Sequence, residues 1–380
     1  MESKDKVFIV FCEEHHYNPL GVVRSLGEAG ISPCVIAYGK KLRVVAASKY
    51  VKQIYHVDTI EDGYRELLNK FGSLKHKPFV ITCDDRVTSY LDERYDELKN
   101  QFYFFNAGEK GRITYFMDKE NINLLAEKHG LKVPKSFVVK KGEVLDDFEY
   151  PIITKAISSN SGAWKDDVFI CNNKNEYLEA SKKILSEIIL VQKFIEKSNE
   201  LCLDGFSVNS GKDVFISIAS KYNYCIPGEY SFDYTSENFN DNSLKQALIS
   251  MLSEIKFEGI FSIEFLIDKN GNYYFLEINF RNSTWSYTST CLGMNLPVLW
   301  ADGTEINAVP KNSYKNIPEN YRSLVEFRDF TTRVRKGKMN IFKWFKDLKS
   351  VNCFMLFNKN DPHPFYRALF DKFKIWKRFF

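Results

Sequence analysis

The stretch from Gly259 to Asn282, GIFSIEFLIDKNGNYYFLEINFRN, holds two apolar runs separated by a short polar turn. The Asn270-Gly271 pair in this turn is the dipeptide most typical of a tight β-hairpin, because both residues readily adopt positive φ. Each run is rich in β-branched and aromatic residues and has the length of a strand. We therefore predict two antiparallel strands here, at residues 259–268 and 273–280.

Four polar side chains lie on this predicted hairpin. Glu277, Asn279 and Arg281 occupy alternate positions and so share one face, and the turn allows Glu264 to face them from the first strand. Two carboxylates buried without an opposite charge are unfavourable, which indicates a bound cation. Oxygen ligands of this kind suit magnesium, whose coordination is usually completed by waters and substrate phosphates. The alternative is a surface ion pair between Glu277 and Arg281 on a solvated face.

The chain of 380 residues is long enough for two or three compact units. Its first part alternates strand-like and helix-like patterns, which is typical of βαβ units with a parallel sheet. We therefore predict an α/β domain at residues 1–112. The patterns are VFIVFC (7–12), LGVVRSLGEAG (20–30), ISPCVIAYG (31–39) and PFVITC (78–83), and the last of these ends at Asp84 and Asp85.

The rest of the chain divides into α+β units. A helical pattern runs from Ile113 to His129 and stops at Gly130, a suitable C-terminal cap. Strands, a helix and an antiparallel run follow, and then the helix predicted from Asn242 to Ile255. The resulting divisions are a small subdomain at 113–190, a large subdomain carrying the hairpin at 191–310, and a helical extension at 311–380.

Composition narrows the class of protein. With 44% hydrophobic and 27% charged residues the chain reads as globular, and a net charge of +4 is too small to indicate nucleic-acid binding. Its eight cysteines include no CxxC pair, so we expect reduced core residues rather than a metal or disulfide framework. We find neither a signal-peptide core nor an apolar run of membrane-spanning length, so we expect a cytoplasmic protein.

Basic residues are concentrated in the last twenty positions, DPHPFYRALFDKFKIWKRFF. Phe365, Leu369, Phe373 and Trp376 fall near one face of a predicted helix, with Lys and Arg on the other. A basic amphipathic helix can lie on an anionic membrane surface. The alternative is a helix that docks its aromatic side chains on the body of the protein.

From residue 1 to about 310 the chain resembles the ATP-grasp superfamily. The order of features carries the resemblance: an N-terminal α/β sheet, Lys119, Lys155 in YPIITKA, the hinge strand VQKFIE (191–196), and the acidic hairpin. The resemblance implies an ATP-grasp fold, mixed α/β and α+β, preceded by a Rossmann-like pre-ATP-grasp domain. It also implies ATP and Mg²⁺ as the bound cofactors.

The resemblance further implies roles for individual residues. The sequence departs from the family in the loop SSNSGAWKDD (158–167), which holds a single glycine where the phosphate-covering loop is commonly glycine-rich. The nucleotide-binding positions are Lys119, Lys155, Ser159, Gly162, Gln192, Lys193, Ile195 and Glu200. The metal ligands are Glu264, Glu277 and Asn279, and the catalytic positions are Arg281, facing the substrate, and Lys221, facing a phosphate.

The implied activity is that of a carboxylate-amine ligase, which activates a carboxylate as an acyl phosphate and lets an amine attack it. The segment after Arg281, ending in LGMNLP, is similar to D-aspartate ligases of cell-wall assembly and to ATP-grasp proteins of surface-polysaccharide loci. Trp285 and Tyr287 are substrate-contact candidates, or else core aromatics. We expect small-molecule carboxylate and amine substrates, membrane contact through the tail, and a homo-oligomer. Three alternatives stay open: a free dipeptide ligase, a biotin-dependent carboxylase-like enzyme, and a non-catalytic nucleotide sensor.

Overall fold

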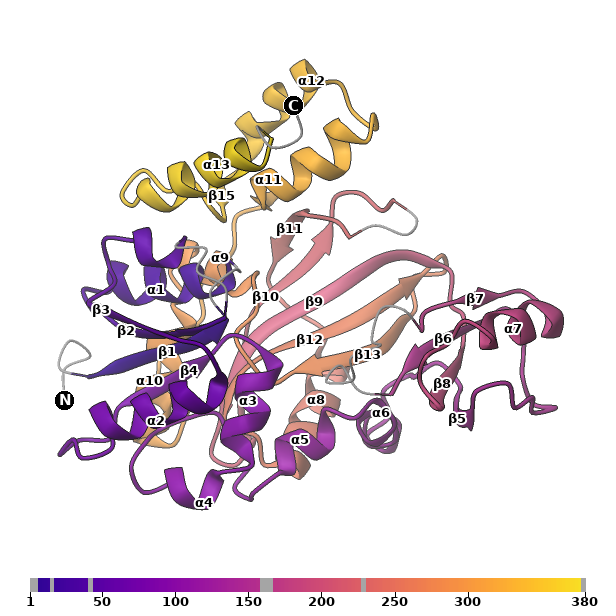
Figure 1. Ribbon diagram of the computed structural model, residues 1–380, viewed down its shortest axis with the longest axis horizontal. Coiled ribbons are helices and arrows are strands. Elements are labelled where there is room, and N and C mark those ends of the chain that lie inside the picture. Colours follow the sequence, from indigo (N-terminus) through magenta and orange to yellow (C-terminus); the bar gives the residue numbers. More distant parts are fainter. Residues whose placement is uncertain (1–5, 14–16, 40–43, 158–166, 227–229, 377–380) are drawn as a thin grey trace.

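The computed structural model describes residues 6–13, 17–39, 44–157, 167–226 and 230–376, with side chains described as far as Asp371. These described residues form three β-sheets, of four, seven and four strands. Figure 1 shows the N-terminal sheet beside the large central sheet, the small sheet at one end, and the C-terminal helices above. Among the described residues, no helix combines the length and apolar character needed to cross a bilayer.

The N-terminal sheet is parallel, as its alternating pattern predicts, with the strand order β3-β2-β1-β4. Its two central strands are buried, apart from the last residue of β1, because helices cover both faces. The strands are β1 (Phe8–Glu13), β2 (Cys34–Tyr38), β3 (Gln53–Val57) and β4 (Phe79–Thr82). The helices are α1 (Asn18–Glu28), α2 (Ile60–Phe71), α3 (Asp85–Asp92) and α4 (Tyr95–Leu98), with a 3-10 turn at Val45–Ala47.

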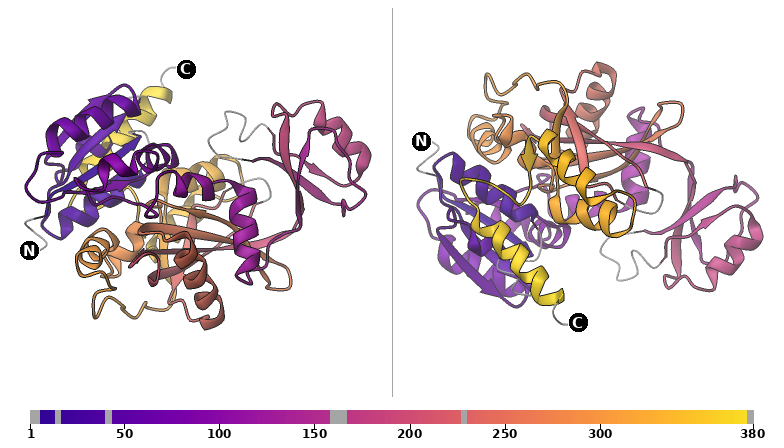
Figure 2. Two further views of the ribbon diagram at one scale, coloured as in Figure 1. Left: turned by 90° about the horizontal axis from the view of Figure 1, so that it is seen from below. Right: turned by 90° about the horizontal axis from the view of Figure 1, so that it is seen from above.

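The small sheet is antiparallel, with the order β5-β8-β6-β7, and lies apart from the rest of the chain in both views of Figure 2. Its strands are β5 (Ser136–Lys140), β6 (Ile152–Ala156), β7 (Ile170–Cys171) and β8 (Ile188–Lys193), and α7 (Lys174–Ser181) packs on it. The predicted boundary at residue 190 is therefore wrong, because it divides β8. The small sheet ends at Lys193.

The single helix predicted from Ile113 to His129 is two helices, α5 (Arg112–Phe116) and α6 (Lys119–Lys128). Asp118 causes the break: its backbone is extended, and its side chain accepts hydrogen bonds from the backbone N–H groups of Glu120 and Asn121. Lys119 is consequently the first residue of a helix. Gly130 follows α6 with φ 79°, as its role as a cap predicts.

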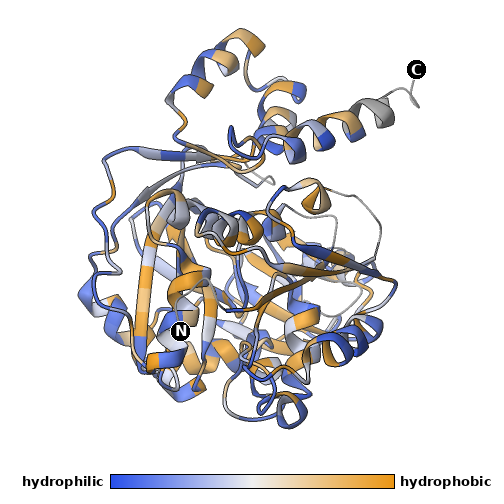
Figure 3. Cartoon of the chain, turned by 90° about the vertical axis from the view of Figure 1, so that its left-hand side faces the viewer, coloured by the Kyte–Doolittle hydropathy of each residue, from blue (hydrophilic) through white to orange (hydrophobic). Residues whose placement is uncertain are grey.

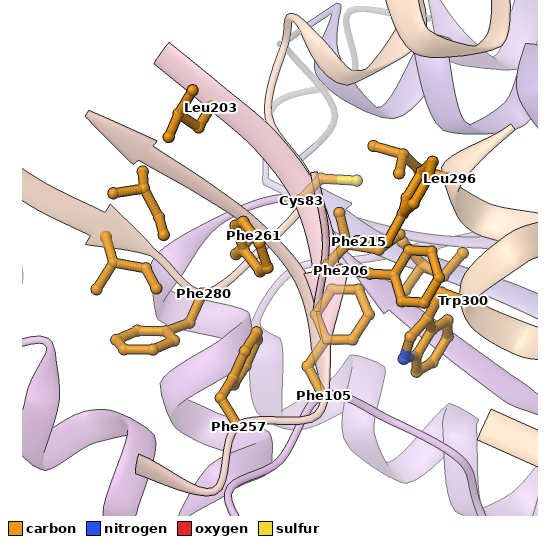
Figure 4. Packing of buried hydrophobic residues seen from close by; sticks show 14 of the residues in the cluster. Cys83, Phe105, Leu203, Phe206, Phe215, Phe257, Phe261, Phe280, Leu296 and Trp300 are labelled. Carbon is orange, nitrogen blue, oxygen red and sulfur yellow. The ribbon is translucent and has the colours of Figure 1, made fainter. Parts of the chain in front are cut away.

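The large sheet carries the hairpin at one edge, in the order β13-β12-β9-β10-β11-β14-β15. Its apolar face packs on α8 (Asn242–Ile255), and an aromatic core continues to α10 (Leu296–Ile306), where Trp300 lies 4.8 Å from the Phe105 ring (Figure 4). One hydrophobic core thus joins the N-terminal domain to the large sheet. The first five strands are β9 (Lys197–Val208), β10 (Asp213–Tyr222), β11 (Asp233–Glu237), β12 (Gly259–Asp268) and β13 (Tyr273–Asn279).

The C-terminal region corrects the prediction of a purely helical extension. β14 (Tyr321–Leu324) and β15 (Cys353–Phe354) belong to the large sheet, so residues beyond 310 complete it. The region also contains α11 (Glu326–Asp329), a π-helical turn (Phe330–Arg335), α12 (Ile341–Asp347), a 3-10 turn (Leu348–Ser350) and α13 (His363–Trp376).

A buried ion pair fastens this region to the N-terminal domain. The Arg24 guanidinium on α1 donates to the Asp361 carboxylate at 3.1 Å, and both side chains are fully buried. Arg24 also donates to the backbone oxygens of Met355 and Leu356. Since a lone buried charge is strongly unfavourable, these partners fix the C-terminal segment in place.

Candidate active site

The hairpin brings its polar residues together as its alternation predicts. Glu264 on β12 pairs directly with Glu277 on β13, and Ser262 pairs with Asn279. The side chains of these two pairs therefore lie on one face of the sheet. Asn279 Nδ2 donates to Glu264 Oε1 at 3.1 Å, and Arg281 Nη2 donates to Asn279 Oδ1 at 2.8 Å. A β-bulge follows Glu264 in this ladder. The result is a hydrogen-bonded set of one carboxylate, an amide and a guanidinium, with the second carboxylate, Glu277, paired opposite Glu264 across the strands.

The electrostatics of this set favour a cation. Burial raises the pKa of Glu264 well above its usual range, and the neighbouring charges of Glu277 and Glu200 raise it further. A divalent ion between the carboxylates would remove this penalty, and carboxylate and amide oxygens suit magnesium. Among the described residues there is no cluster of three His, Cys, Asp or Glu side chains that could hold a metal alone.

Two lysines lie near these carboxylates: Lys119, the first residue of α6, and Lys155 on β6. Lys155 on β6 is half-buried, and its Nζ donates to Gln192 Oε1 at 2.8 Å. Burial lowers the pKa of Lys155 to about 8, with a further lowering by Lys119 and an opposing effect of Glu277. Two neighbouring ammonium groups beside a carboxylate pair form a site for a metal-bound polyphosphate.

The N-terminal domain contributes residues that the sequence reading did not assign to the site. Arg281 Nε donates to Asp85 Oδ1 at 3.0 Å, and its Nη2 lies 3.4 Å from Asp85 Oδ2. Asp85 begins α3 at the carboxyl end of β4, the edge where ligands bind in open parallel sheets. A cavity of about 230 Å³ opens beside this pair. Its charged lining residues are Glu13, Asp84, Asp85, Arg86, Lys119, Glu277 and Arg281.

The segment after Arg281 is held by a buried aspartate on β9. Asp204 Oδ1 accepts hydrogen bonds from the hydroxyls of Ser283 and Ser286. Burial raises the pKa of Asp204 to about 6, although both serines lower it. Within the described part of the chain, no partner reaches the buried Asp204 Oδ2 or Ser262 Oγ, which lie on paired residues of β9 and β12. No motif in the sequence marks Asp204.

The two aromatic substrate-contact candidates lie in packed surroundings. Tyr287 is 3% exposed and donates to Glu28 Oε1 at 2.8 Å, so it is a core residue that joins α9 (Ser286–Cys291) to α1. The Trp285 ring lies 4.1 Å from that of Tyr234 and is half-buried. Tyr287 is therefore a core aromatic residue, whereas the ring of Trp285 is partly exposed.

The hinge strand differs from expectation in detail. The Gln192 side chain is buried between Lys155 and Ser136 and does not face an open site for the base of a nucleotide. The backbone N–H of Lys193 donates to the Lys135 carbonyl at 2.8 Å, so this donor is not available to bind the base of a nucleotide. Ile195 is half-buried in the loop after β8. Ser159 and Gly162 lie outside the described residues.

Lys221 and Glu200, the two remaining assignments, have different surroundings. Glu200 is nearly buried on β9 and pairs with Lys197 at 2.6 Å. Lys221 pairs with Glu237 at 2.8 Å and lies across from the buried Leu201, whereas the adjacent Ser220 is in the row of Cys202 and Glu264. Because successive strand residues point to opposite faces, Lys221 lies on the face opposite the carboxylates. The structure thus contradicts its predicted contact with phosphate.

Comparison with known proteins gives concordant results. No protein-family model matches the chain. A D-alanine–D-alanine ligase from Fusobacterium nucleatum is 30% identical over 261 residues, which cover 62% of this chain and 85% of that enzyme. The chain is therefore related in sequence to a ligase.

Solved structures share the fold. An L-amino acid ligase from Bacillus licheniformis superposes with a TM-score of 0.58 at 15% identity, over 79% of this chain and 74% of that one. The biotin carboxylase domain of a Hydrogenobacter thermophilus 2-oxoglutarate carboxylase, solved with MgADP and bicarbonate, gives a TM-score of 0.62 at 17% identity, over 83% and 73%. The predicted fold class is confirmed.

Proposed function

Because this chain belongs to the ATP-grasp family of ATP-dependent ligases, we propose that it joins a small-molecule carboxylate to an amino group with ATP and Mg²⁺. The connected set Glu264, Asn279 and Arg281, with Glu277 opposite, carries the proposal. It provides oxygen ligands for the metal and a guanidinium for a carboxylate within one hydrogen-bonded group. A protein that only senses nucleotide would have no need of the guanidinium.

Each part of the site has a role in the proposed reaction. Glu264, Glu277 and Asn279 hold Mg²⁺, which neutralises charge on the phosphates when bound. Lys119 and Lys155 bind phosphate oxygens and stabilise the charge that develops as the γ-phosphoryl group moves to the substrate carboxylate. The amine then attacks the carbonyl carbon of the acyl phosphate, the C–N bond forms as the C–O bond to phosphate breaks, and the nitrogen loses a proton to solvent. Arg281 holds the reacting carboxylate through its planar pair of donors.

We propose an α-amino acid as one substrate. The cavity beside Arg281 has both signs of charge on its wall, with Arg281 and Arg86 near Asp84, Asp85 and Glu13. A zwitterion presents a carboxylate and an ammonium group that match such a wall. Asp85 contacts the Arg281 guanidinium in the way a substrate carboxylate would. When a substrate carboxylate displaces Asp85 from Arg281, the Asp85 carboxylate is free to bind the substrate's ammonium group.

The biological setting is a further proposal. The similarity of the segment after Arg281 to D-aspartate ligases and surface-polysaccharide proteins supports a cell-envelope or polysaccharide precursor as the second substrate. A cytoplasmic location and a homo-oligomeric state accord with that setting. Phe365 and Leu369 of the tail face the cavity between α11, α12 and α13, which accords with the alternative that the tail docks its aromatic side chains on the body of the protein.

Substrate-dependent phosphate release tests the proposal. Purified enzyme with ATP and Mg²⁺ is given pooled amino acids, alone and with uronic acids or muropeptides, and the products are weighed by mass spectrometry. We expect release only with a carboxylate and an amine together, and a product lighter than their sum by one water. Turnover that requires bicarbonate, or nucleotide binding without any turnover, would contradict an amide ligase.

The pKa of Lys155 predicts a pH dependence for ATP use. Below about pH 8 the side chain is cationic and binds phosphate, and above that value it loses its charge. We expect kcat/KM for ATP to fall as pH rises from 7.5 to 9.5, by up to about tenfold per unit. Lys155→Arg should abolish this fall, since arginine keeps its charge throughout the range. A fall that is unchanged in Lys155→Arg would assign the titration to another group.

A further inference from the structure

An apolar cavity lies in the C-terminal region, away from the residues assigned to catalysis. It has a volume of about 620 Å³ and opens between α11, α12 and α13. Phe365 on α13 stacks on Phe327 at 5.2 Å, which holds one wall in place. The main lining residues are Phe327, Phe330, Trp344, Phe354, Phe365 and Leu369.

Large apolar side chains are exposed on α12 beside this cavity. Phe342 is 81% exposed, Phe345 57% and Ile341 39%. Ile341 and Phe345 also line the cavity, so the exposed residues continue its apolar wall to the surface. Apolar residues clustered in this way on a soluble protein mark an interaction site. We call residues 341–349 the α12 surface.

Lysines alternate with these aromatic residues. Phe342 is three residues from Phe345 and four from Lys346, and Lys349 is four residues from Phe345 and three from Lys346, so rings and ammonium groups are neighbours along this segment. Lys343 is exposed one position further round. The α12 surface thus combines exposed rings with a basic rim.

The sequence around α12 is strongly basic. From Arg333 to Lys349 the sequence has seven basic residues and one acidic residue, Asp347. Asp347 is already paired with Arg322 at 2.8 Å and with Arg333 at 3.0 Å. Within the described ranges, no acidic side chain pairs with the lysines at 338, 343, 346 and 349. Positive charge therefore remains on the exposed side.

The inner side of α12 is held firmly. Trp344 Nε1 donates to Asp329 Oδ2 at 2.7 Å, and both residues are buried. Arg333 joins Asp329 and Asp347 to Asp233 on β11. In Figures 1 and 3 the C-terminal helices project from the body, and Figure 3 shows hydrophobic and hydrophilic residues mixed along them. The α12 surface is thus displayed from a fixed platform.

We propose that the α12 surface docks on an anionic lipid bilayer. Exposed Phe342 and Phe345 enter the boundary between headgroups and acyl chains, and the lysines bind anionic headgroups. Charge complementarity favours a bilayer over a protein partner, because Lys343, Lys346 and Lys349, which no acidic side chain of the described residues pairs, lie among the exposed rings of Phe342 and Phe345. The inference rests on neither the identity of the substrates nor the proposed activity.

Co-sedimentation with vesicles tests this docking. Full-length protein is mixed with vesicles of phosphatidylcholine alone, or with 30% phosphatidylglycerol added, and the bound fraction is measured at low and high salt. We expect binding to the anionic vesicles only, weakened by high salt. Phe342→Ser/Phe345→Ser should lower the partition coefficient at least about tenfold, and Lys343→Glu/Lys346→Glu/Lys349→Glu should remove the preference for anionic lipid.

Leu185→Ser is the matched control, because Leu185 is 64% exposed but lies between α7 and β8, outside the C-terminal region. It should bind vesicles like the unchanged protein. An unchanged melting temperature shows that each variant is folded. Equal binding to both vesicle types, binding that survives the double Phe substitution, or no binding to any vesicle would overturn the proposal. In the last case a protein partner or a second copy of the chain would be the occupant.

Discussion

Replacing Glu277 by glutamine is expected to lower ATP-dependent phosphate release by at least about a thousandfold. Glutamine keeps the size of the side chain and removes its charge, so the carboxylate pair on β12 and β13 becomes a single carboxylate. One carboxylate and an amide bind Mg²⁺ weakly, and the phosphates lose the cation that neutralises them.

The same substitution should leave the fold intact. Glu277 raises the pKa of Glu264, so the two carboxylates repel each other while no cation is bound. Without Mg²⁺ we expect the melting temperature of Glu277→Gln to equal or exceed that of the unchanged protein. The matched control is Glu187→Gln, at an 81% exposed side chain paired with Lys141, which should retain full turnover. Near-normal phosphate release by Glu277→Gln would contradict the metal assignment.

The hairpin illustrates what local sequence can determine. An Asn-Gly turn sets two strands side by side, and the period of two then places Glu277 and Asn279 on one face with Glu264 opposite. Neither step depends on the rest of the chain, so both could be predicted. The bulge after Glu264 was not predicted, yet it leaves this face unchanged because it follows the pair.

Other parts of the site depend on contacts that no local pattern contains. Asp85 meets Arg281 across 196 positions of sequence, and Asp204 meets Ser283 across 79. In the sequence Asp85 ends an apolar run, and only the direction of β4 in the folded sheet brings it to the cavity. Lys221 is the converse: its place in the chain is typical of the family, but strand pairing turns it away.

Element boundaries failed where a single polar side chain decided them. Periodicity continues through residues 113–129, and the cap made by Asp118 divides the helix. β14 and β15 are short strands of four and two residues that join an existing sheet edge. Their stability comes from the neighbouring strand, so their own composition gives little signal.

Replacing Arg281 by lysine is expected to lower kcat/KM for the carboxylate substrate by about 100-fold, roughly 3 kcal/mol, and to change KM for ATP by less than about threefold. Lysine keeps the charge but has a single donor group, so it cannot contact Asn279 and a carboxylate with the geometry of the guanidinium. Because Asp85 now occupies the position proposed for the substrate, Asp85→Asn should have a separate effect. It should raise KM for the amino acid while leaving the metal ligands untouched.

The measurement is steady-state phosphate release with each substrate varied in turn, and the matched control is Arg65→Lys, at a 64% exposed arginine on α2. That variant should keep all constants within about twofold. If Arg281→Lys instead raised KM for ATP and left kcat/KM for the carboxylate substrate unchanged, the Arg281 guanidinium would bind the phosphates of ATP and not the substrate carboxylate. The cavity beside Asp85 would then have no claim to be the amino-acid site, because only the Arg281 fork provides it with a partner for the carboxylate.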